Sequence, residues 1–267
     1  MCLKDSVLRK GARPMSDKEL TTLFTGRHCE VLDEVGSTNT YLSDLLRTVT
    51  LPEGSVIRAI SQNAGRGQYG SAWHSAPGEN LLLSFVFYPS GIAPKEVFVL
   101  NKSYALGIFD FIASVLGKQA FIKWPNDILA GGRKVAGLLV ENSIQAGTIV
   151  HSILGAGINV NQREFPALPD ATSLSLLSGK RYNPDELFNI LCGFLEKRYL
   201  QVKNRQWQQL DADYLKALYR RNEWHMFEAA GNSFEGFIEG VDENGRLMVR
   251  NRQDRLHLFG VKEISFL

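Results

Sequence analysis

The order in which apolar segments follow one another restricts the fold of this chain more than any other feature of its sequence. Residues 55–61 (SVIRAIS) and 80–89 (NLLLSFVFYP) are apolar and rich in β-branched or aromatic side chains, which predicts two buried strands. A helical repeat over 94–117 follows, then three strand patterns (AFIKWPN, VAGLLVEN and TIVHSILGAGINV) and a second helical repeat from Pro184. Runs of strands between helices predict an α+β fold: a mixed or antiparallel sheet with helices packed on one face.

Two weaker helical patterns flank these segments. Ser37 or Thr38 is a suitable N-cap for a short amphipathic helix that continues through residues 41–49. Another helical pattern covers about 207–220.

From Glu223 onward the apolar repeat has a period of two. Five short strand patterns follow (HMFEAA, SFEGFIEGV, RLMVRNR, LHLFG and EISFL), and they predict a small SH3-like β-barrel. Asn244-Gly245 between two of them predicts a hairpin with a type I′ turn, in which both central residues need positive φ. We therefore expect a leader segment over 1–32, in which Met1 or Met15 is the native start, a core domain over 33–221 and the barrel over 222–267.

Composition excludes several classes of protein. Apolar residues make up 44% of the 267 residues and charged residues 22%, so a disordered, collagen-like or coiled-coil chain is excluded. The formal net charge of +2 gives no overall attraction to nucleic acid or an anionic membrane. Cys2, Cys29 and Cys192 lack the spacing of a disulfide framework or a zinc site, which favours a reducing compartment. Because no secretory signal or transmembrane pattern is found, we expect a cytoplasmic protein.

A glycine-rich segment after the first buried strand carries an arginine. Gly65, Gly67 and Gly70 match GxGxxG, but the segment leads to another strand and no acidic residue stands about 20 positions on, so a Rossmann site is not predicted. Backbone N–H groups of such a loop can approach an oxyanion, and Arg66 can pair with a carboxylate or phosphate, which suits an acyl or phosphoryl ligand. A hairpin loop without a ligand is the alternative interpretation.

The segment Lys123-Trp124-Pro125-Asn126-Asp127 ends a predicted strand on a proline, an amide and a carboxylate. Mg²⁺ prefers one or two carboxylates together with substrate phosphates, so Asn126 and Asp127 are candidates for holding a metal and a phosphate oxygen. The alternative is a simple turn, because Asn and Asp side chains bond readily to their own backbone.

Two glycine-containing strands complete the candidate motifs. In GRKVAGLLVE (132–141), Lys134 stands at the strand entrance, where an ammonium can neutralise a phosphoryl or carboxylate oxygen, and Gly137 permits close backbone approach. GAGINVN (155–161) places glycines in an apolar strand that ends in amides. A solvent-facing lysine and glycines that relieve packing are the alternatives. The five histidines lack metal-ligand spacing and no GxSxG motif occurs, so a covalent hydrolase is not predicted.

Taken in order, these motifs resemble those of the biotin protein ligase family. The series is GSTN at 36–39, SQNAGRG at 61–67, KWPND at 123–127, GRKVAGLLVE at 132–141 and GAGINVN at 155–161. The resemblance covers residues 33–177 and implies a class II synthetase-like ligase core, with the predicted barrel as the family's small second domain. It also implies an ATP-dependent biotin-[acetyl-CoA-carboxylase] ligase that forms biotinyl-5′-AMP and pyrophosphate from biotin and MgATP, then transfers biotin to a lysine of a carrier domain.

The resemblance assigns roles by motif position. The implied catalytic residues are Lys134, Arg66 and Asp127, and Asp127 is also the implied Mg²⁺ ligand. The implied biotin-binding residues are Ser37, Thr38, Asn39, Gln62, Gly65, Arg66, Gly67, Gln68, Lys134 and Gly137. The implied ATP and adenylate contacts are Arg66, Trp73, Asn126, Lys134 and Asn159.

The loop GRGQYGSAW differs from the arginine-rich GRGRxGRxW of many family members. Gln68, Tyr69 and Ser71 replace possible cations, so retention of the adenylate is expected to be weaker or differently arranged.

The resemblance also implies partners. We expect the carrier to be a biotin carboxyl carrier protein or domain of a biotin-dependent carboxylase, no membrane contact, and a monomer or homodimer. Bifunctional family members carry a DNA-binding winged helix before the ligase core; the 36 residues before Ser37 are too few for one, so no DNA binding is expected.

Two other functions fit the same motifs. One is a lipoate or octanoate ligase or transferase of related fold, and the other is a non-catalytic biotin sensor. The presence of Lys134, Asp127 and Arg66 together favours catalysis over the sensor.

Overall fold

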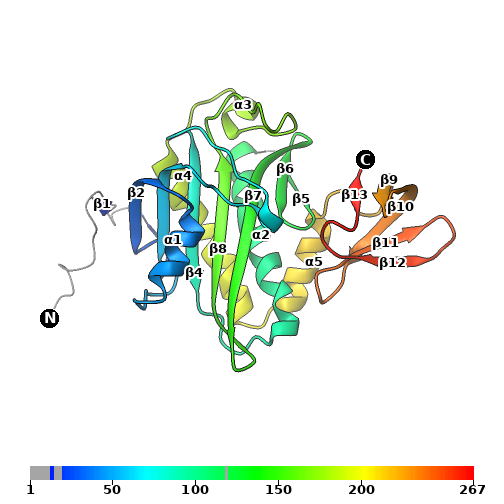
Figure 1. The fold of residues 1–267 in the computed structure, drawn as a ribbon, viewed down its shortest axis with the longest axis horizontal. Helices are drawn as coiled ribbons and strands as arrows, with labels where there is room; N and C mark the ends of the chain where they lie inside the picture. The colour runs from blue at the N-terminus through cyan, green and yellow to red at the C-terminus, as the bar shows by residue number, and fades with distance from the viewer. Residues whose placement is uncertain (1–12, 15–19, 118–119) are drawn as a thin grey trace.

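A computed structural model describes residues 13–14, 20–117 and 120–267. The largest element is an eight-stranded sheet in the order β1-β2-β3-β4-β8-β7-β6-β5 (Figure 1). β2 and β3 pair in parallel, and the other neighbours are antiparallel, which confirms the predicted mixed sheet. The strands are β1 Arg13–Pro14, β2 Cys29–Val35, β3 Val56–Gln62, β4 Asn80–Phe87, β5 Ala120–Lys123, β6 Asp127–Ala130, β7 Arg133–Gln145 and β8 Thr148–Asn159.

The central strand β4 is buried along its whole length, as its apolar run predicts. It lies between β3 and β8, and helices cover both of its faces. Phe85 and Phe87 pack into the main core, while Val86 packs into a smaller cluster on the opposite face. A continuous apolar pattern is typical of a strand buried on both faces.

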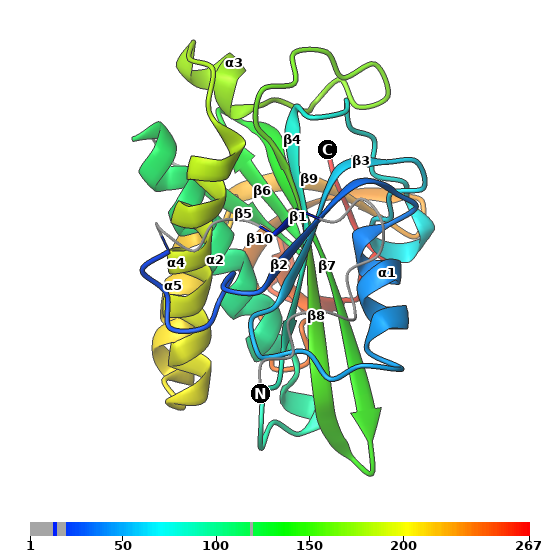
Figure 2. The same cartoon turned by 90° about the vertical axis from the view of Figure 1, so that its left-hand side faces the viewer.

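Three long helices form a layer on one face of the sheet (Figure 2). They are α2 Phe98–Leu116, α4 Pro184–Lys203 and α5 Trp207–Ala217, and a 3₁₀ turn at Pro94–Glu96 precedes α2. In the described part of the chain, Pro94–Leu116 is the one stretch long and apolar enough to cross a membrane, and 61% of its apolar 18-residue window is buried inside the protein. Burial of this extent is typical of a helix in the core of a folded domain.

An ion-pair cluster joins these three helices. Arg198 on α4 is 9% exposed, and its guanidinium binds Asp110 on α2 (2.7 Å) and Asp213 on α5 (2.7 Å). Removing one partner would leave a charge with poor solvation, so the cluster holds the helices in one arrangement.

The first helix, α1 Thr38–Leu45, lies on the opposite face of the sheet from these three. Its Leu42 packs with Ile57, Val86 and Ile153 in a cluster separate from the main core. The prediction of helices on one face therefore holds for α2, α4 and α5 and is corrected for α1. Ser37 is its N-cap residue, as predicted.

The segment that precedes residue 33 joins the fold. β2 begins at Cys29, inside the segment predicted as a leader, and backbone N–H groups of Leu23, Phe24 and Thr25 donate to the Glu196 carboxylate at 2.7–2.9 Å. Local hydrophobic periodicity carries no signal for this contact, because Glu196 lies more than 170 positions further on. Met1, Cys2 and Met15 lie outside the described residues, and with them the prediction that Met1 or Met15 is the native start.

The C-terminal residues form a separate antiparallel sheet in the order β12-β11-β10-β9-β13. Its strands are β9 Trp224–Ala229, β10 Asn232–Val241, β11 Leu247–Asn251, β12 Leu256–Phe259 and β13 Ser265–Phe266, which agrees with the five predicted strand patterns. The sheet packs next to the larger sheet and its helices near β5 and α5 (Figure 1). Trp124 Nε1 donates to the Gly245 carbonyl at 2.9 Å across this contact.

The hairpin between β10 and β11 is present, but its predicted turn type is wrong. Gly245 has φ of +83°, whereas Asn244 is not among the residues with positive φ, so the turn is not type I′. Instead the Asp242 carboxylate accepts from the Asn244 and Arg246 N–H groups, at 3.0 and 2.8 Å. A side chain that bonds the turn backbone stabilises this longer loop.

One helix was not predicted, and one motif has the turn that its alternative interpretation allowed. The short helix α3 Leu174–Ser178 is capped by the Ser173 side chain. Within KWPND, residues 124–126 form a tight turn with a cis Trp124-Pro125 bond, between Lys123 at the end of β5 and Asp127 at the start of β6.

Candidate active site

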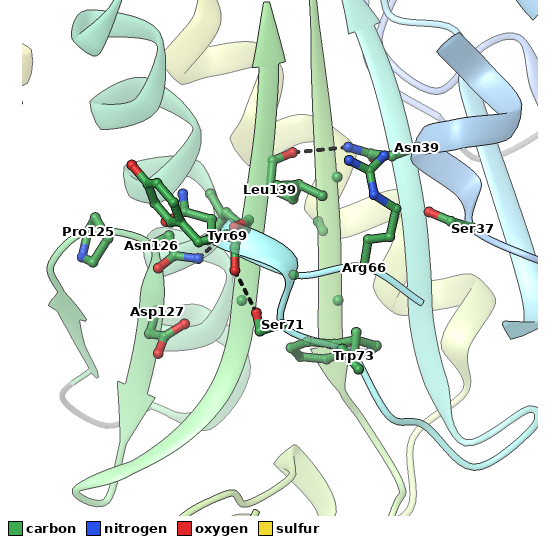
Figure 3. A pocket seen from close by; sticks show the side chains of 18 of the residues that line it. Ser37, Asn39, Arg66, Tyr69, Ser71, Trp73, Pro125, Asn126, Asp127 and Leu139 are labelled. Carbon is green, nitrogen blue, oxygen red and sulfur yellow. Dashed lines mark hydrogen bonds between the residues drawn. The ribbon is translucent and has the colours of Figure 1, made fainter. Parts of the chain in front are cut away.

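The predicted motifs meet at a cavity of about 280 Å³ on the α1 face of the sheet. Its wall comes from the start of α1, from residues 65–73 (the glycine loop), from β6, β7 and β8, and from Val261 and Lys262 in the turn between β12 and β13. Figure 3 shows Arg66 and Asn39 toward one end of the cavity and Pro125, Asn126 and Asp127 toward the other. The sheet therefore collects residues from five separate motifs into one site.

Polar residues at the start of α1 form one wall. Gln62 Oε1 accepts from the Thr38 N–H (2.7 Å) and from Thr38 Oγ1 (3.1 Å). Ser84 Oγ lies 2.8 Å from Thr38 Oγ1 and also bonds Asn39 Oδ1, while Asn39 Nδ2 donates to Glu141 Oε2 at 2.8 Å. These buried groups hold one another in place, so the wall offers a ligand fixed donors and acceptors.

Three glycines form the floor of the cavity on β7 and β8. A Cβ added at Gly157 would lie 2.5 Å from Trp73 Cζ2, one at Gly137 would lie 2.9 Å from Trp73 Cζ3, and one at Gly155 would lie 2.9 Å from Asn39 Cγ. Gly137 and Gly157 are opposite each other in the β7–β8 pair. Because these glycines lack a Cβ, the Trp73 and Asn39 side chains can pack directly against the strands. This is the close approach that the sequence predicted for Gly137.

The glycine loop is folded as a small hairpin over this floor. Trp73 N–H donates to the Gly65 carbonyl at 2.9 Å, and Gly67 N–H donates to the Ser71 carbonyl at 2.7 Å. The Trp73 indole rests on the floor, and in the described structure its Nε1 is buried without a hydrogen-bond partner, as is Gln68 Oε1. Buried polar atoms are normally bonded, so these two are available to a ligand.

Arg66 points from the loop toward α1. Its guanidinium pairs with Glu141 Oε1 at 2.8 Å and lies 3.3 Å from Thr40 Oγ1. Arg66 and Glu141 are partly exposed, so the pair contributes little stability by itself. It orients the arginine and links the loop to the same carboxylate that Asn39 binds.

Lys134 is the second cation of the site. Its ammonium lies 2.6 Å from Asp127 Oδ1 and 5.6 Å from the centroid of the Trp73 ring. The backbone of Lys134 is fixed on both sides, because its N–H donates to the Asp170 carbonyl (2.9 Å) and its carbonyl accepts from Thr172 (2.8 Å). The side chain is partly exposed, so it faces the cavity from a rigid strand and is open to an anion.

Most of the residues predicted for the site line the cavity. They are Ser37, Thr38, Asn39, Gln62, Arg66, Gly67, Gln68, Trp73, Asn126, Asp127, Lys134 and Gly137. Gly65, the first residue of the loop, is not among the lining residues, and Trp73 packs against it. Asn159 is buried next to the site, and its Nδ2 donates to the Thr172 carbonyl at 3.0 Å. In this structure Asn159 supports the segment that bonds Lys134, and contact with a nucleotide stays a prediction.

Sequence reasoning did not assign roles to Glu141, Leu168, Val261 or Lys262. Glu141 ends the GRKVAGLLVE motif, so its position was visible although its pairing with Arg66 was not. Leu168 and the two C-terminal residues line the cavity from segments that carry no motif.

The two cysteines in the described part of the chain, Cys29 and Cys192, supply no nucleophile to the cavity. Burial raises the pKa of the Cys29 thiol to about 12 and raises that of Cys192 as well, so both are thiols at neutral pH. Neither residue lines the cavity.

Comparison with known proteins agrees with this geometry. The family described as "Biotin/lipoate A/B protein ligase family" matches residues 31–159. The chain is 30% identical to the bifunctional ligase/repressor BirA of Bacillus spizizenii over 97% of this chain and 82% of that protein. It is also 30% identical to the biotin--[acetyl-CoA-carboxylase] ligase of Mycobacterium tuberculosis over 88% of this chain and 89% of that protein.

A solved structure shares the fold. The biotin protein ligase from Aquifex aeolicus in complex with biotin and ATP superposes with a TM-score of 0.74, at 23% identity, over 90% of this chain and 99% of that chain. The fold and the site define a ligase of the class that activates a carboxylate and transfers it to a protein. The chain belongs to the biotin/lipoate A/B protein ligase family, and within it to the biotin protein ligases.

Proposed function

We propose that the protein joins biotin to a lysine of a biotin carboxyl carrier domain in two steps. In the first, a carboxylate oxygen of biotin attacks the α-phosphorus of ATP, which forms biotinyl-5′-AMP and releases pyrophosphate. In the second, the amine of the carrier lysine attacks the acyl carbon, which forms the amide, releases AMP and loses a proton. The observation that carries this proposal is the cavity in which Lys134, Arg66 and the glycine loop meet over a glycine floor.

Charge explains why the first step needs these residues. A carboxylate and a triphosphate repel each other, so cations must offset the repulsion and stabilise the charge that develops at phosphorus. Lys134 and Arg66 line the cavity from a rigid strand and from the loop. Their present partners, Asp127 and Glu141, hold these cations until an anionic substrate competes for them.

The loop protects the intermediate. A mixed anhydride of biotin and AMP reacts with water, so a site that excludes water preserves it for the carrier lysine. Residues of the glycine loop line the cavity, and two of them, Trp73 and Gln68, each carry a buried polar atom without a hydrogen-bond partner in the described structure.

Mg²⁺ fits this site as a partner of ATP. Asp127 is the one carboxylate among the cavity residues of the described chain, and no group of three or more potential metal ligands occurs there. One carboxylate is enough for Mg²⁺ when substrate phosphates and water complete the coordination. Asp127 would hold the ion, which supplies positive charge to the phosphates.

The decisive experiment measures biotin transfer directly. The purified protein is incubated with biotin, ATP, Mg²⁺ and a carrier domain, and the carrier is probed with streptavidin. We expect a biotinylated carrier and biotin-dependent exchange between ATP and pyrophosphate. Lipoylation of the carrier without biotinylation would point to the lipoate branch of the family, and biotin binding without exchange would indicate a sensor.

A further inference from the structure

Ser84 is a polar residue in the middle of an apolar strand. The part of β4 from Leu81 to Phe87 reads LLLSFVF, and Ser84 is its one polar residue. The side chain is fully buried, with 0% of the residue exposed. A buried hydroxyl destabilises a protein unless it forms a hydrogen bond, so a serine at this position needs a polar partner from outside the strand.

The partner of Ser84 is Asn39, in the first turn of α1. Asn39 Nδ2 donates to Glu141 Oε2 at 2.8 Å and to the Leu139 carbonyl at 3.3 Å. Both of these oxygens can only accept, so the amide nitrogen faces β7 and the amide oxygen bonds Ser84. The Ser84 hydroxyl gives its proton to Asn39 Oδ1, because an amide oxygen cannot donate.

Three neighbouring strands hold this amide. Ser84 on β4 lies opposite Gly155 on β8, and Gly155 lies opposite Leu139 on β7. Asn39 crosses this row from the Ser84 hydroxyl to the Leu139 carbonyl, and Figure 3 shows the bond at the Leu139 end. A Cβ at Gly155 would lie 2.9 Å from Asn39 Cγ, so the row has room for the amide because Gly155 has no side chain. The serine and the glycine thus serve the same residue.

The amide held in this way has one hydrogen-bonding position left. Its two N–H groups are used by Glu141 and Leu139, and an amide oxygen accepts two hydrogen bonds, of which Ser84 supplies one. Asn39 lines the cavity, so it meets a ligand as an acceptor. With the amide turned over, the same residue would present N–H donors. Ser84 as a donor and Glu141 as an acceptor select the first of these two states.

Biotin carries the group that suits such an acceptor. Its ring system contains a cyclic urea with two N–H donors, and a buried N–H needs an acceptor. Asp127, which pairs with Lys134, lies toward the other end of the cavity from Asn39 (Figure 3). A biotin carboxylate beside Lys134 therefore leaves the neutral ring system for the Asn39 end. Gln62 Oε1, which accepts from the Thr38 N–H at 2.7 Å, is a second acceptor in the same wall.

We propose that Ser84 is a positioning residue for the acyl substrate: it holds the Asn39 amide with its oxygen as the acceptor for a ring N–H of biotin. This inference rests on the proposed ligase function. Ser84 is not among the residues that line the cavity, so it acts through Asn39. Loss of the Ser84 hydroxyl should therefore weaken the binding of biotin and leave the binding of ATP unchanged.

The test compares variants of the full-length protein. Ser84→Ala removes the hydroxyl, Ser84→Cys keeps a side chain of similar size with a weak donor, Asn39→Ala removes the amide, and a double variant combines Ser84→Ala with Asn39→Ala. Ser103→Ala on α2 is the matched control, because Ser103 is also buried and its Oγ has no hydrogen-bond partner in the described structure. Each variant is assayed for the KM for biotin and the KM for ATP in pyrophosphate exchange, and for thermal unfolding.

For Ser84→Ala we expect the KM for biotin to rise roughly tenfold, as for a buried amide that loses one hydrogen bond, while the KM for ATP stays at the wild-type value. Ser84→Cys should fall between Ser84→Ala and wild type. The double variant should have the same KM for biotin as Asn39→Ala alone, because Ser84 acts through that amide. Ser103→Ala should match wild type in both KM values.

Three results would overturn the inference. The first is a wild-type KM for biotin in Ser84→Ala, and the second is an equal rise in the KM for ATP, since the hydroxyl would then support the fold in general. The third is a double variant in which the two single effects multiply, since Ser84 would then act independently of Asn39. If Ser84→Ala does not fold, Ser84→Cys takes its place, and a wild-type KM for biotin in that variant would overturn the inference.

The wild-type protein separates this inference from the proposed function. If wild type shows no biotin-dependent exchange, the proposed function is wrong. If wild type is active and Ser84→Ala matches it, only the role of Ser84 is wrong.

Discussion

The packing of Trp73 on the cavity floor predicts the effect of a single added methyl group. Gly157→Ala places a Cβ 2.5 Å from Trp73 Cζ2, whereas ordinary carbon contacts begin near 3.4 Å. The indole must therefore shift by about 1 Å, since 3.4 − 2.5 = 0.9 Å. The neighbouring β4 and β7 fix the β8 backbone, so the ring and the glycine loop should move instead.

A shift of this size matters more for catalysis than for stability. Misplacing a positioning group by about 1 Å can lower a rate on the order of 100-fold, equivalent to about 2.7 kcal/mol of activation free energy. Alanine is otherwise no worse than glycine inside a strand, so the free energy of unfolding should change by less than about 1 kcal/mol. We expect Gly157→Ala to be folded, with kcat/KM for pyrophosphate exchange reduced about 100-fold.

The assay needs a control and a rescue. Gly193→Ala on α4 adds a Cβ that meets nothing within 4 Å, so it should keep full exchange activity and gain about 0.5–1 kcal/mol of stability. Trp73→Phe shortens the ring, and the double variant with Gly157→Ala should lose less than the two single losses combined. Wild-type kcat/KM in a folded Gly157→Ala protein would refute the reasoning, because Trp73 would then not rest on Gly157 in the working enzyme.

Three further predictions follow from the same structure. Lys134→Ala should reduce adenylate formation by about 100-fold or more, measured by pyrophosphate exchange, while circular dichroism stays native; full exchange activity would exclude its role at the phosphate. Arg66→Gly should free the loop from Glu141 and let adenylate escape, so that bystander proteins become biotinylated in a streptavidin blot; labelling confined to the carrier would contradict this. Burial raises the pKa of Asp213, but hydrogen bonds and charge from Arg198 outweigh it and hold the pKa below its ordinary 3.8. The stability from this ion pair is thus present above about pH 4 and lost as pH falls through the folded pKa. The Asp213→Asn protein should have a lower melting temperature than wild type at pH 7, and its melting temperature should fall less than that of wild type as the pH is lowered below about 4. Melting temperatures of the two proteins that fall in parallel with pH would argue against the pair.

The sequence by itself predicted most of the elements and the candidate residues of the site. Periodicity reports which side of a helix or strand is buried, so it located α2, α4, β4 and β8, whose residues pack along their own length. The motifs predicted residues that line the cavity, such as Lys134, Asp127 and Gly137, because these candidates are recognised by residue type and short spacing, which a sequence displays directly. The mixed sheet also followed, since strands in runs between helices have few ways to pair.

Only the tertiary structure decided which distant residues meet. Glu141 is 75 positions from Arg66, and Lys262 is 193 positions from Tyr69, so neither pair leaves a trace in local spacing. The placement of α1 on the opposite face of the sheet and the turn at Asn244 depend likewise on neighbours outside the local pattern. Such contacts are set by strand register and by the docking of one sheet against another. For that reason the motifs predicted a loop short of cations, and only the folded chain showed Lys262, in the turn between β12 and β13, at its tip.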